Sequence, residues 1–247
     1  MPTAVMIEAA AGEGWTPDEV VDVAVRATGW QLDAPGPWGV WHLKPGVVRV
    51  AWFEEAPRAV TADLARIGRS AVKITVGAMS FEDLLGEGSR AASRTFVCTW
   101  DALTPTSFLR RGRPYPAPDP ALLVHSVAQT WNTHCTPGLG VDAGALAAAA
   151  RAIAMVAIDG YTKVADTRRG ADARPGTGFV GRVRMRVDPS KLGADAAALA
   201  ALLLAAQWTG VGVGAAHGMG GAQMTFESGT TRPRRQPGRS TGGRRAR

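Results

Sequence analysis

The sequence is poor in cysteine, in lysine and in long apolar runs. Its two cysteines, Cys98 and Cys135, are far apart and form no CxxC motif, which argues against a disulfide framework and against a thiolate zinc site. The most apolar stretch, residues 194–208, is interrupted by Asp195 and Gln207 and is too short to span a bilayer. The N-terminus lacks a basic segment followed by an apolar one, so no secretory signal is expected. We therefore expect a cytoplasmic protein with no membrane partner, no metal site and no cofactor.

Arginine supplies nearly all of the positive charge, because only Lys44, Lys73, Lys163 and Lys191 are lysines. The net charge of +7 arises from the end of the chain, where residues 232–247 hold seven arginines and no acid. Without that stretch the other 231 residues carry no net charge, so any basic surface of the folded body must be local. The planar guanidinium of arginine binds two phosphate oxygens at once. A genome rich in G and C would also favour arginine codons, so the excess alone identifies no function.

The first part of the chain has the pattern of a ferredoxin-like unit. Thr16 as N-cap and Pro17 at the first helical position predict the start of a helix that ends near Gly29. Hydrophobic periodicity predicts the order strand, helix, strand, strand, helix, strand, which is the βαββαβ pattern. Residues 1–90 are therefore interpreted as an N-terminal ferredoxin-like domain. The predicted ranges are 2–10, 16–28, 40–43, 47–53, 58–67 and 72–78.

Residues 91–228 are predicted to form a second, more irregular α+β domain. Phe96, Cys98 and Trp100 fall on one face of its first strand. Residues 229–247 are low in apolar residues and rich in Pro, Gly and Arg, which predicts a disordered Arg-rich tail. The predicted elements of the second domain are strands at 94–100, 155–165, 180–187 and 223–227, helices at 120–132, 144–152 and 194–208, and a Pro-rich loop at 104–119.

Three motifs stand out in the second domain: TPTSF at 104–108, GFVGRVRMRV at 178–187, and WTGVGVGAAHGMGGAQM at 208–224. In the last motif a glycine-rich loop follows a helix and precedes a strand. A dinucleotide-binding loop requires the reverse order, which argues against that ligand. In their order and spacing the three motifs resemble the endoribonucleases of the repeat-associated (RAMP) superfamily that process precursor CRISPR RNA, the sixth Cas protein. The resemblance covers roughly residues 35–226.

This resemblance implies an α+β protein with two ferredoxin-like (RRM-like) units in tandem and a C-terminal glycine-rich loop. It also implies a metal-independent endoribonuclease whose partner is CRISPR repeat RNA, as precursor and as mature crRNA. The ribose 2′-hydroxyl attacks the adjacent phosphate and leaves a 2′,3′-cyclic phosphate and a 5′-hydroxyl. The guide RNA then serves a CRISPR interference complex, and the protein acts as a monomer or homodimer. Two alternatives stay open: a relative that only holds guide RNA, and a generic ferredoxin-like protein whose glycines are structural.

The glycine-rich loop is the first candidate RNA-binding site. Glycine adopts positive φ and admits a close ligand, and successive backbone amides can form a nest that binds an anion. The alternative is a tight reversal that packs the preceding helix against its sheet. One departure from the family pattern is that no basic side chain stands near Gly214. The candidate residues are Gly210, Gly212, Gly214, His217, Gly218 and Gly220.

Arginines supply two further sets of candidate RNA contacts. Arg110, Arg111 and Arg113 lie together in the predicted Pro-rich loop, where they can bind phosphates. Arg182 and Arg184 alternate on a predicted strand and share one face, so they either meet RNA or pair with acids. The Arg-rich tail would add salt-sensitive affinity for RNA. Each set has the alternative of an ordinary solvated surface.

Catalysis without a metal requires a general base, a general acid and a cation that stabilises the phosphorane. The resemblance implies a histidine at the end of the first helix, but the matching stretch, TGWQLD at 28–33, has none. His42 is the best substitute as base or acid, and Lys44, two residues later and expected on the same face of a strand, is the candidate phosphate cation. The alternative is that His42 has a structural role and that the protein has lost its activity.

Overall fold

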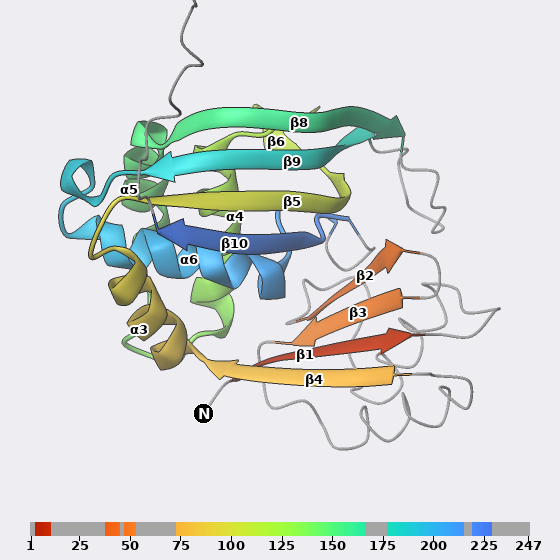
Figure 1. The fold of residues 1–247 in the computed structure, drawn as a ribbon, viewed down its shortest axis with the longest axis horizontal. Coiled ribbons are helices and arrows are strands. Elements are labelled where there is room, and N and C mark those ends of the chain that lie inside the picture. Colours follow the sequence, from red (N-terminus) through yellow and green to blue (C-terminus); the bar gives the residue numbers. More distant parts are fainter. Residues whose placement is uncertain are drawn as a thin grey trace, which may run out of the picture.

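The structure is a computed structural model that describes residues 3–10, 38–44, 47–52, 73–165, 177–214 and 219–228. Figure 1 shows two four-stranded antiparallel sheets side by side, with helices on one face of the second. The sheets are formed by consecutive parts of the chain. No described helix is both long and apolar enough to cross a membrane.

The first sheet contains four strands in the order β2-β3-β1-β4. Strand β1 lies between β3 and β4 and is antiparallel to both, with Ile7 opposite Val50 on one side and Val76 on the other. The first and third strands are therefore neighbours, as the βαββαβ pattern requires. The helices predicted at 16–28 and 58–67 lie outside the described residues. The strands are β1 (Thr3–Ala10), β2 (Trp38–Lys44), β3 (Val47–Trp52) and β4 (Lys73–Ser80).

The second sheet repeats this order with β10-β5-β9-β8. Along the chain, helix α4 (Pro120–His134) lies between β5 and β8, and helix α6 (Asp195–Thr209) lies between β9 and β10. The chain order is thus β5-α4-β8-β9-α6-β10, a second βαββαβ unit, and the predicted tandem ferredoxin-like fold is confirmed. The strands are β5 (Phe96–Thr106), β8 (Ala154–Ala165), β9 (Thr177–Val187) and β10 (Ala222–Ser228).

The core of the second unit lies between this sheet and its helices. Phe96, Cys98 and Trp100 alternate along β5 and are all buried, as the sequence predicts. Helix α6 buries ten of its 15 residues, which is why its sequence is apolar on every side. It is covered by the sheet, by α4 and by an additional helix, α3 (Phe81–Ala91), which the sequence analysis did not predict.

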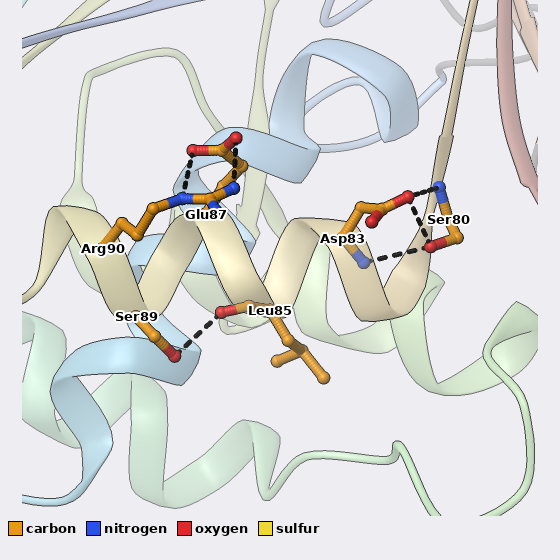
Figure 2. A network of polar contacts seen from close by, with 6 residues as sticks. All are labelled: Ser80, Asp83, Leu85, Glu87, Ser89 and Arg90. Atoms are coloured by element: carbon orange, nitrogen blue, oxygen red, sulfur yellow. Dashed lines mark hydrogen bonds and ion pairs between the residues drawn. The ribbon is translucent and has the colours of Figure 1, made fainter.

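Helix α3 starts at a capping box. The Ser80 hydroxyl accepts a hydrogen bond from the Asp83 amide at 3.0 Å, and the Asp83 carboxylate returns to Ser80 (Figure 2). Further along the same helix, the Glu87 carboxylate pairs with the Arg90 guanidinium at 2.5 Å. A β-carbon at Gly88 would lie 2.6 Å from the Ala201 nitrogen, so glycine is needed where α3 crosses α6.

The predicted Pro-rich loop at 104–119 is corrected by the structure. Strand β5 continues to Thr106, and a short hairpin follows, formed by β6 (Phe108–Arg110) and β7 (Arg113–Tyr115). The turn residues Arg111 and Gly112 both have positive φ, +53° and +73°, which is the geometry of a two-residue hairpin turn with the right twist. A short helix, α5 (Ala143–Ala149), packs on α4 farther along the chain.

Candidate nucleic-acid interface

The three sequence motifs meet at one place, beside the end of β5. The TPTSF motif forms this end, and the glycine-rich loop runs along it. The Gly221 amide donates to the Thr104 hydroxyl at 2.7 Å, the Gly220 amide to the Pro105 carbonyl at 2.9 Å, and the Val213 amide to the Ser107 carbonyl at 2.9 Å. The loop is thereby clamped to the strand that leads into the β6–β7 hairpin.

Close backbone approach explains the glycines of these motifs. A β-carbon at Gly212, whose φ is +84°, would collide with the Ser107 carbonyl oxygen, and one at Gly220 would collide with the Val211 carbonyl. In the GFVG motif, a β-carbon at Gly178 would lie 2.7 Å from backbone atoms of both Pro105 and Thr106. Each of these glycines allows one motif to pack directly against another backbone.

The amides of the glycine-rich loop are used inside the protein. The Gly212 amide donates to the Ser126 hydroxyl of α4 at 2.8 Å, and the Val211 amide donates to the Gly220 carbonyl at 2.8 Å. Together with those of Val213, Met219, Gly220 and Gly221, six amides have internal acceptors. These six amides already donate to protein acceptors, which argues against an anion nest formed by them, and RNA contact at Gly210, Gly212, Gly214 and Gly220 stays a prediction. His217 and Gly218 lie outside the described residues.

Two of the three arginines of β9, Arg182 and Arg184, have acidic partners, whereas no ion pair among the described residues involves Arg186. The Arg182 guanidinium forms two hydrogen bonds with the Asp101 carboxylate, at 2.6 and 3.2 Å, and this carboxylate raises the pKa of Arg182. Arg184 lies 3.7 Å from Glu227. Pairing with acids, one of the two alternatives for Arg182 and Arg184, is thus what the structure shows for these two residues. A phosphate on this face would also meet negative charge, which weakens the case for RNA contact there.

The arginines of the β6–β7 hairpin are exposed, and no ion pair among the described residues involves them. Together with Pro114 and Tyr115, Arg110, Arg111 and Arg113 line an open cavity of about 570 Å³. The Arg110 guanidinium lies over the Tyr115 ring, 5.2 Å from its centre, as in a cation–π contact. The hairpin thus presents three uncompensated positive charges beside an aromatic ring, a combination suited to phosphates and bases of an RNA strand.

Tyr115 is a candidate that the sequence analysis missed. Its signal is its position two residues after Arg113, but the hairpin that brings its ring beneath Arg110 was not predicted. Aromatic rings next to arginines are characteristic of surfaces that stack single-stranded bases. The hairpin arginines and Tyr115 therefore form one candidate site, which we call the hairpin site.

The candidate catalytic residues His42 and Lys44 lie on β2, the edge strand of the first sheet. Strand β2 contacts β5 and α6 of the second unit, so it lies at the junction of the two sheets. The pairing of β2 with β3 shifts register between His42 and Lys44. This irregularity interrupts the regular alternation from which we expected the two side chains to share a face. The structure describes the backbone of β2, and its side chains lie outside the description.

The described residues contain no group of three or more His, Cys, Asp or Glu side chains that would hold a metal ion. The remaining described histidines, His125 and His134, both lie on α4 and are partly buried. The structure thus brings the hairpin arginines together in one place and the β9 arginines together in another. The glycine-rich loop joins the base of the hairpin, since Gly212 packs against Ser107.

Known proteins match this architecture. The family model of the CRISPR-associated endoribonuclease Cas6 matches residues 101–222, a range that contains all three motifs except two residues at the end of the third. The solved Cas6 of Thermus thermophilus has 22% identity and a TM-score of 0.66, covering 91% of this chain and 98% of that one. A Cas6 in complex with a substrate mimic has 20% identity and a TM-score of 0.67, covering 91% and 100%. A chain of a partial Cas6-RT-Cas1–Cas2 complex has 13% identity and a TM-score of 0.62, covering 91% and 46%. No curated protein matches significantly.

Proposed function

Because the chain belongs to the Cas6 family of CRISPR-associated endoribonucleases, which take part in CRISPR RNA processing, we propose that it cuts a CRISPR repeat RNA without a metal ion. The ribose 2′-hydroxyl at the cut site attacks the adjacent phosphorus, and the 5′-oxygen of the next nucleotide leaves. The products are a 2′,3′-cyclic phosphate and a 5′-hydroxyl, and no water is consumed in this step. The mature guide RNA stays bound or passes to a CRISPR interference complex.

The observation that carries this proposal beyond family membership is the hairpin site. Outside the Arg-rich end the chain is neutral, so an RNA strand is attracted only where positive charge is left uncompensated. Arg110, Arg111 and Arg113 supply such charge on one short hairpin, whereas Arg182 is held by Asp101. We therefore place the main RNA contact on the hairpin, with Arg184 and residues 229–247 as weaker, salt-sensitive contacts.

For the chemistry we propose His42 as proton donor or acceptor and Lys44 as the cation near the phosphate. Histidine changes charge near neutral pH, which suits it to either proton-transfer role. The register shift in β2 at these residues supports the assignment, because such bulges are frequent beside active sites and re-aim side chains. We also propose His217, in the glycine-rich loop, as an RNA contact.

The second candidate is an RNA-binding member of the family that does not cleave. It is favoured by one observation: residues 28–33 contain no histidine where the family pattern has one. The two candidates differ in their products but not in their affinity for RNA.

A single-turnover assay separates these candidates. Purified protein is mixed with repeat RNA in EDTA, and the product ends are analysed. We expect one cut, a cyclic phosphate on the upstream product, and a rate that falls about 100-fold or more in His42→Ala, in line with the usual contribution of proton transfer. Tight binding of intact RNA would support the second candidate, and a cut that requires a divalent ion would contradict the proposed chemistry.

A further inference from the structure

An aromatic cluster holds the N-terminal end of the β6–β7 hairpin, at Phe108, which we call its first foot. Phe108 begins the hairpin and is buried, with its ring 6.4 Å from that of Trp100. Trp100 in turn packs edge-on against Phe179 at 5.3 Å, and Phe179 stacks against Tyr161 of β8 at 5.8 Å with an interplanar angle of 21°. Four rings therefore connect the start of the hairpin with the edge strand of the sheet.

The same cluster also contacts the C-terminal end of the hairpin, at Tyr115 and Pro116, which we call its second foot, through a hydroxyl group. The hairpin ends at Tyr115, and the Tyr161 hydroxyl donates a hydrogen bond to the carbonyl of Pro116 at 2.7 Å. Pro114 and Pro116 have no amide N–H, so this segment offers few donors of its own for attachment to the sheet. The Pro116 carbonyl is the group through which β8 holds it. Both feet of the hairpin thus rest on one set of packed rings.

A bulge in β8 directs Tyr161 toward the hairpin. Asp159 pairs with Arg182 and Thr162 with Val180, so Gly160 and Tyr161 together face the single residue Gly181. Gly160 has a φ of +63°, and Gly181 has a φ of +143°. A β-carbon at Gly181 would lie 3.0 Å from the Gly160 carbonyl oxygen. A bulge of this kind re-aims a side chain, and here the side chain aimed is that of Tyr161.

From this geometry we infer that Tyr161 is a positioning residue for RNA binding: its hydroxyl fixes the hairpin so that Arg110, Arg111 and Arg113 meet RNA in one orientation. The inference rests on the proposed RNA-binding function of the hairpin site. Tyr161 touches no RNA in this assignment, since its hydroxyl is occupied by Pro116. Its effect on RNA is transmitted through the backbone of the hairpin.

The test is a cycle of variants in the full chain. Tyr161→Phe keeps the ring and removes only the hydroxyl, and it is measured alone and combined with the triple change Arg110→Ala, Arg111→Ala, Arg113→Ala. We expect Tyr161→Phe to weaken binding of repeat RNA by roughly two- to tenfold, the usual net effect of one hydrogen bond. In the triple variant, where the arginines are gone, the same change is expected to have no further effect.

Thr162→Val is the matched control, because it removes the hydroxyl of the next residue on β8, which is exposed and makes no side-chain hydrogen bond in the described part of the chain. The inference would be overturned if Tyr161→Phe lowered RNA affinity equally in the natural chain and in the triple variant. It would also be overturned if Thr162→Val lowered RNA affinity as much as Tyr161→Phe does. Unchanged affinity in Tyr161→Phe would overturn it as well. If the triple variant itself binds RNA as tightly as the natural chain, the proposed function of the hairpin fails instead.

A readout without RNA tests the positioning directly. Trypsin cleaves after arginine and requires local opening of the chain, so the hairpin arginines report on how firmly the hairpin is held. We expect faster cleavage after Arg110 and Arg111 in Tyr161→Phe than in the natural chain or in Thr162→Val, with the thermal midpoint of unfolding changed little. An unchanged cleavage rate would contradict a role of Tyr161 in holding the hairpin.

Discussion

Replacing Gly212 by alanine should destabilise the fold far more than replacing a glycine of similar backbone conformation elsewhere. A side chain at φ of +84° costs about 1–2 kcal/mol in the left-handed region. The new β-carbon would also collide with the Ser107 carbonyl, so the bond from the Val213 amide to that carbonyl and the bond from the Gly212 amide to Ser126 must lengthen. Each bond contributes about 1 kcal/mol. We expect a total loss of roughly 3–4 kcal/mol, a large share of the 5–15 kcal/mol typical of a domain.

The control is Gly193→Ala, because Gly193 also has positive φ, +58°, but a β-carbon there meets no atom within 4 Å. Its expected cost is only the backbone term of about 1–2 kcal/mol. Urea unfolding followed by tryptophan fluorescence gives both free energies, and their difference measures the collision. Equal losses in the two variants would refute the tight reversal that we describe. If Gly212→Ala kept normal stability but lost RNA affinity, that result would support the anion nest instead.

The remaining predictions concern binding, catalysis and the buried thiol. In the triple variant of Arg110, Arg111 and Arg113, RNA affinity should fall, and the slope of log affinity against log salt should decrease by about two, since each phosphate contact on a single strand contributes about 0.7. Arg90→Ala with Arg151→Ala is the charge control, and an equal change there would contradict the hairpin site. Lys44→Ala should slow single-turnover cleavage in EDTA and lower the salt slope by no more than about 0.7, the share of one phosphate contact; a normal rate would remove Lys44 from the site. Burial raises the pKa of the Cys98 thiol, so the native state keeps a proton that the unfolded state loses. The contribution of this thiol to stability should be constant below about pH 8.5 and fall above it, as measured by urea midpoints from pH 7 to 10. Cys98→Ala, compared over the same range, should show a smaller fall, because burial also raises the pKa of Cys135.

Most of the fold was predictable because the strands follow simple rules. Much of β5 alternates buried with partly buried residues, the second half of β9 alternates buried with more exposed ones, and this period is visible in the sequence. Helix α3 was not predicted, although Ser80 and Asp83 form a capping box at its start. The helix contains Gly86 and Gly88, which lower its intrinsic propensity. Gly88 is needed for the crossing with α6, a contact between residues more than 100 positions apart that a local pattern does not contain.

The site was less predictable for a similar reason. The sequence shows arginines in both groups but does not show which of them have acidic neighbours. Asp101 pairs with Arg182 because the register of β5 and β9 places the two residues opposite each other. Glu227 of β10 pairs with Arg184 of β9 although β5 lies between these two strands. The hairpin was missed because its turn uses Arg111 at positive φ, where an asparagine or aspartate before glycine would have been the usual signal.

The glycine motif and the hairpin that we propose to bind RNA are nevertheless connected. Gly212 packs against Ser107, the residue immediately before the hairpin, and a β-carbon there would also lie 3.5 Å from the Phe108 ring. The glycine reversal therefore supports the first foot of the hairpin, while Tyr161 supports the second. In the function that we propose for the hairpin, the motif contributes to RNA recognition by holding the hairpin in place, and the arginines make the contact. It follows that a change in the motif should alter RNA affinity only to the extent that the hairpin moves, so affinity and hairpin cleavage by trypsin should change together in every glycine variant.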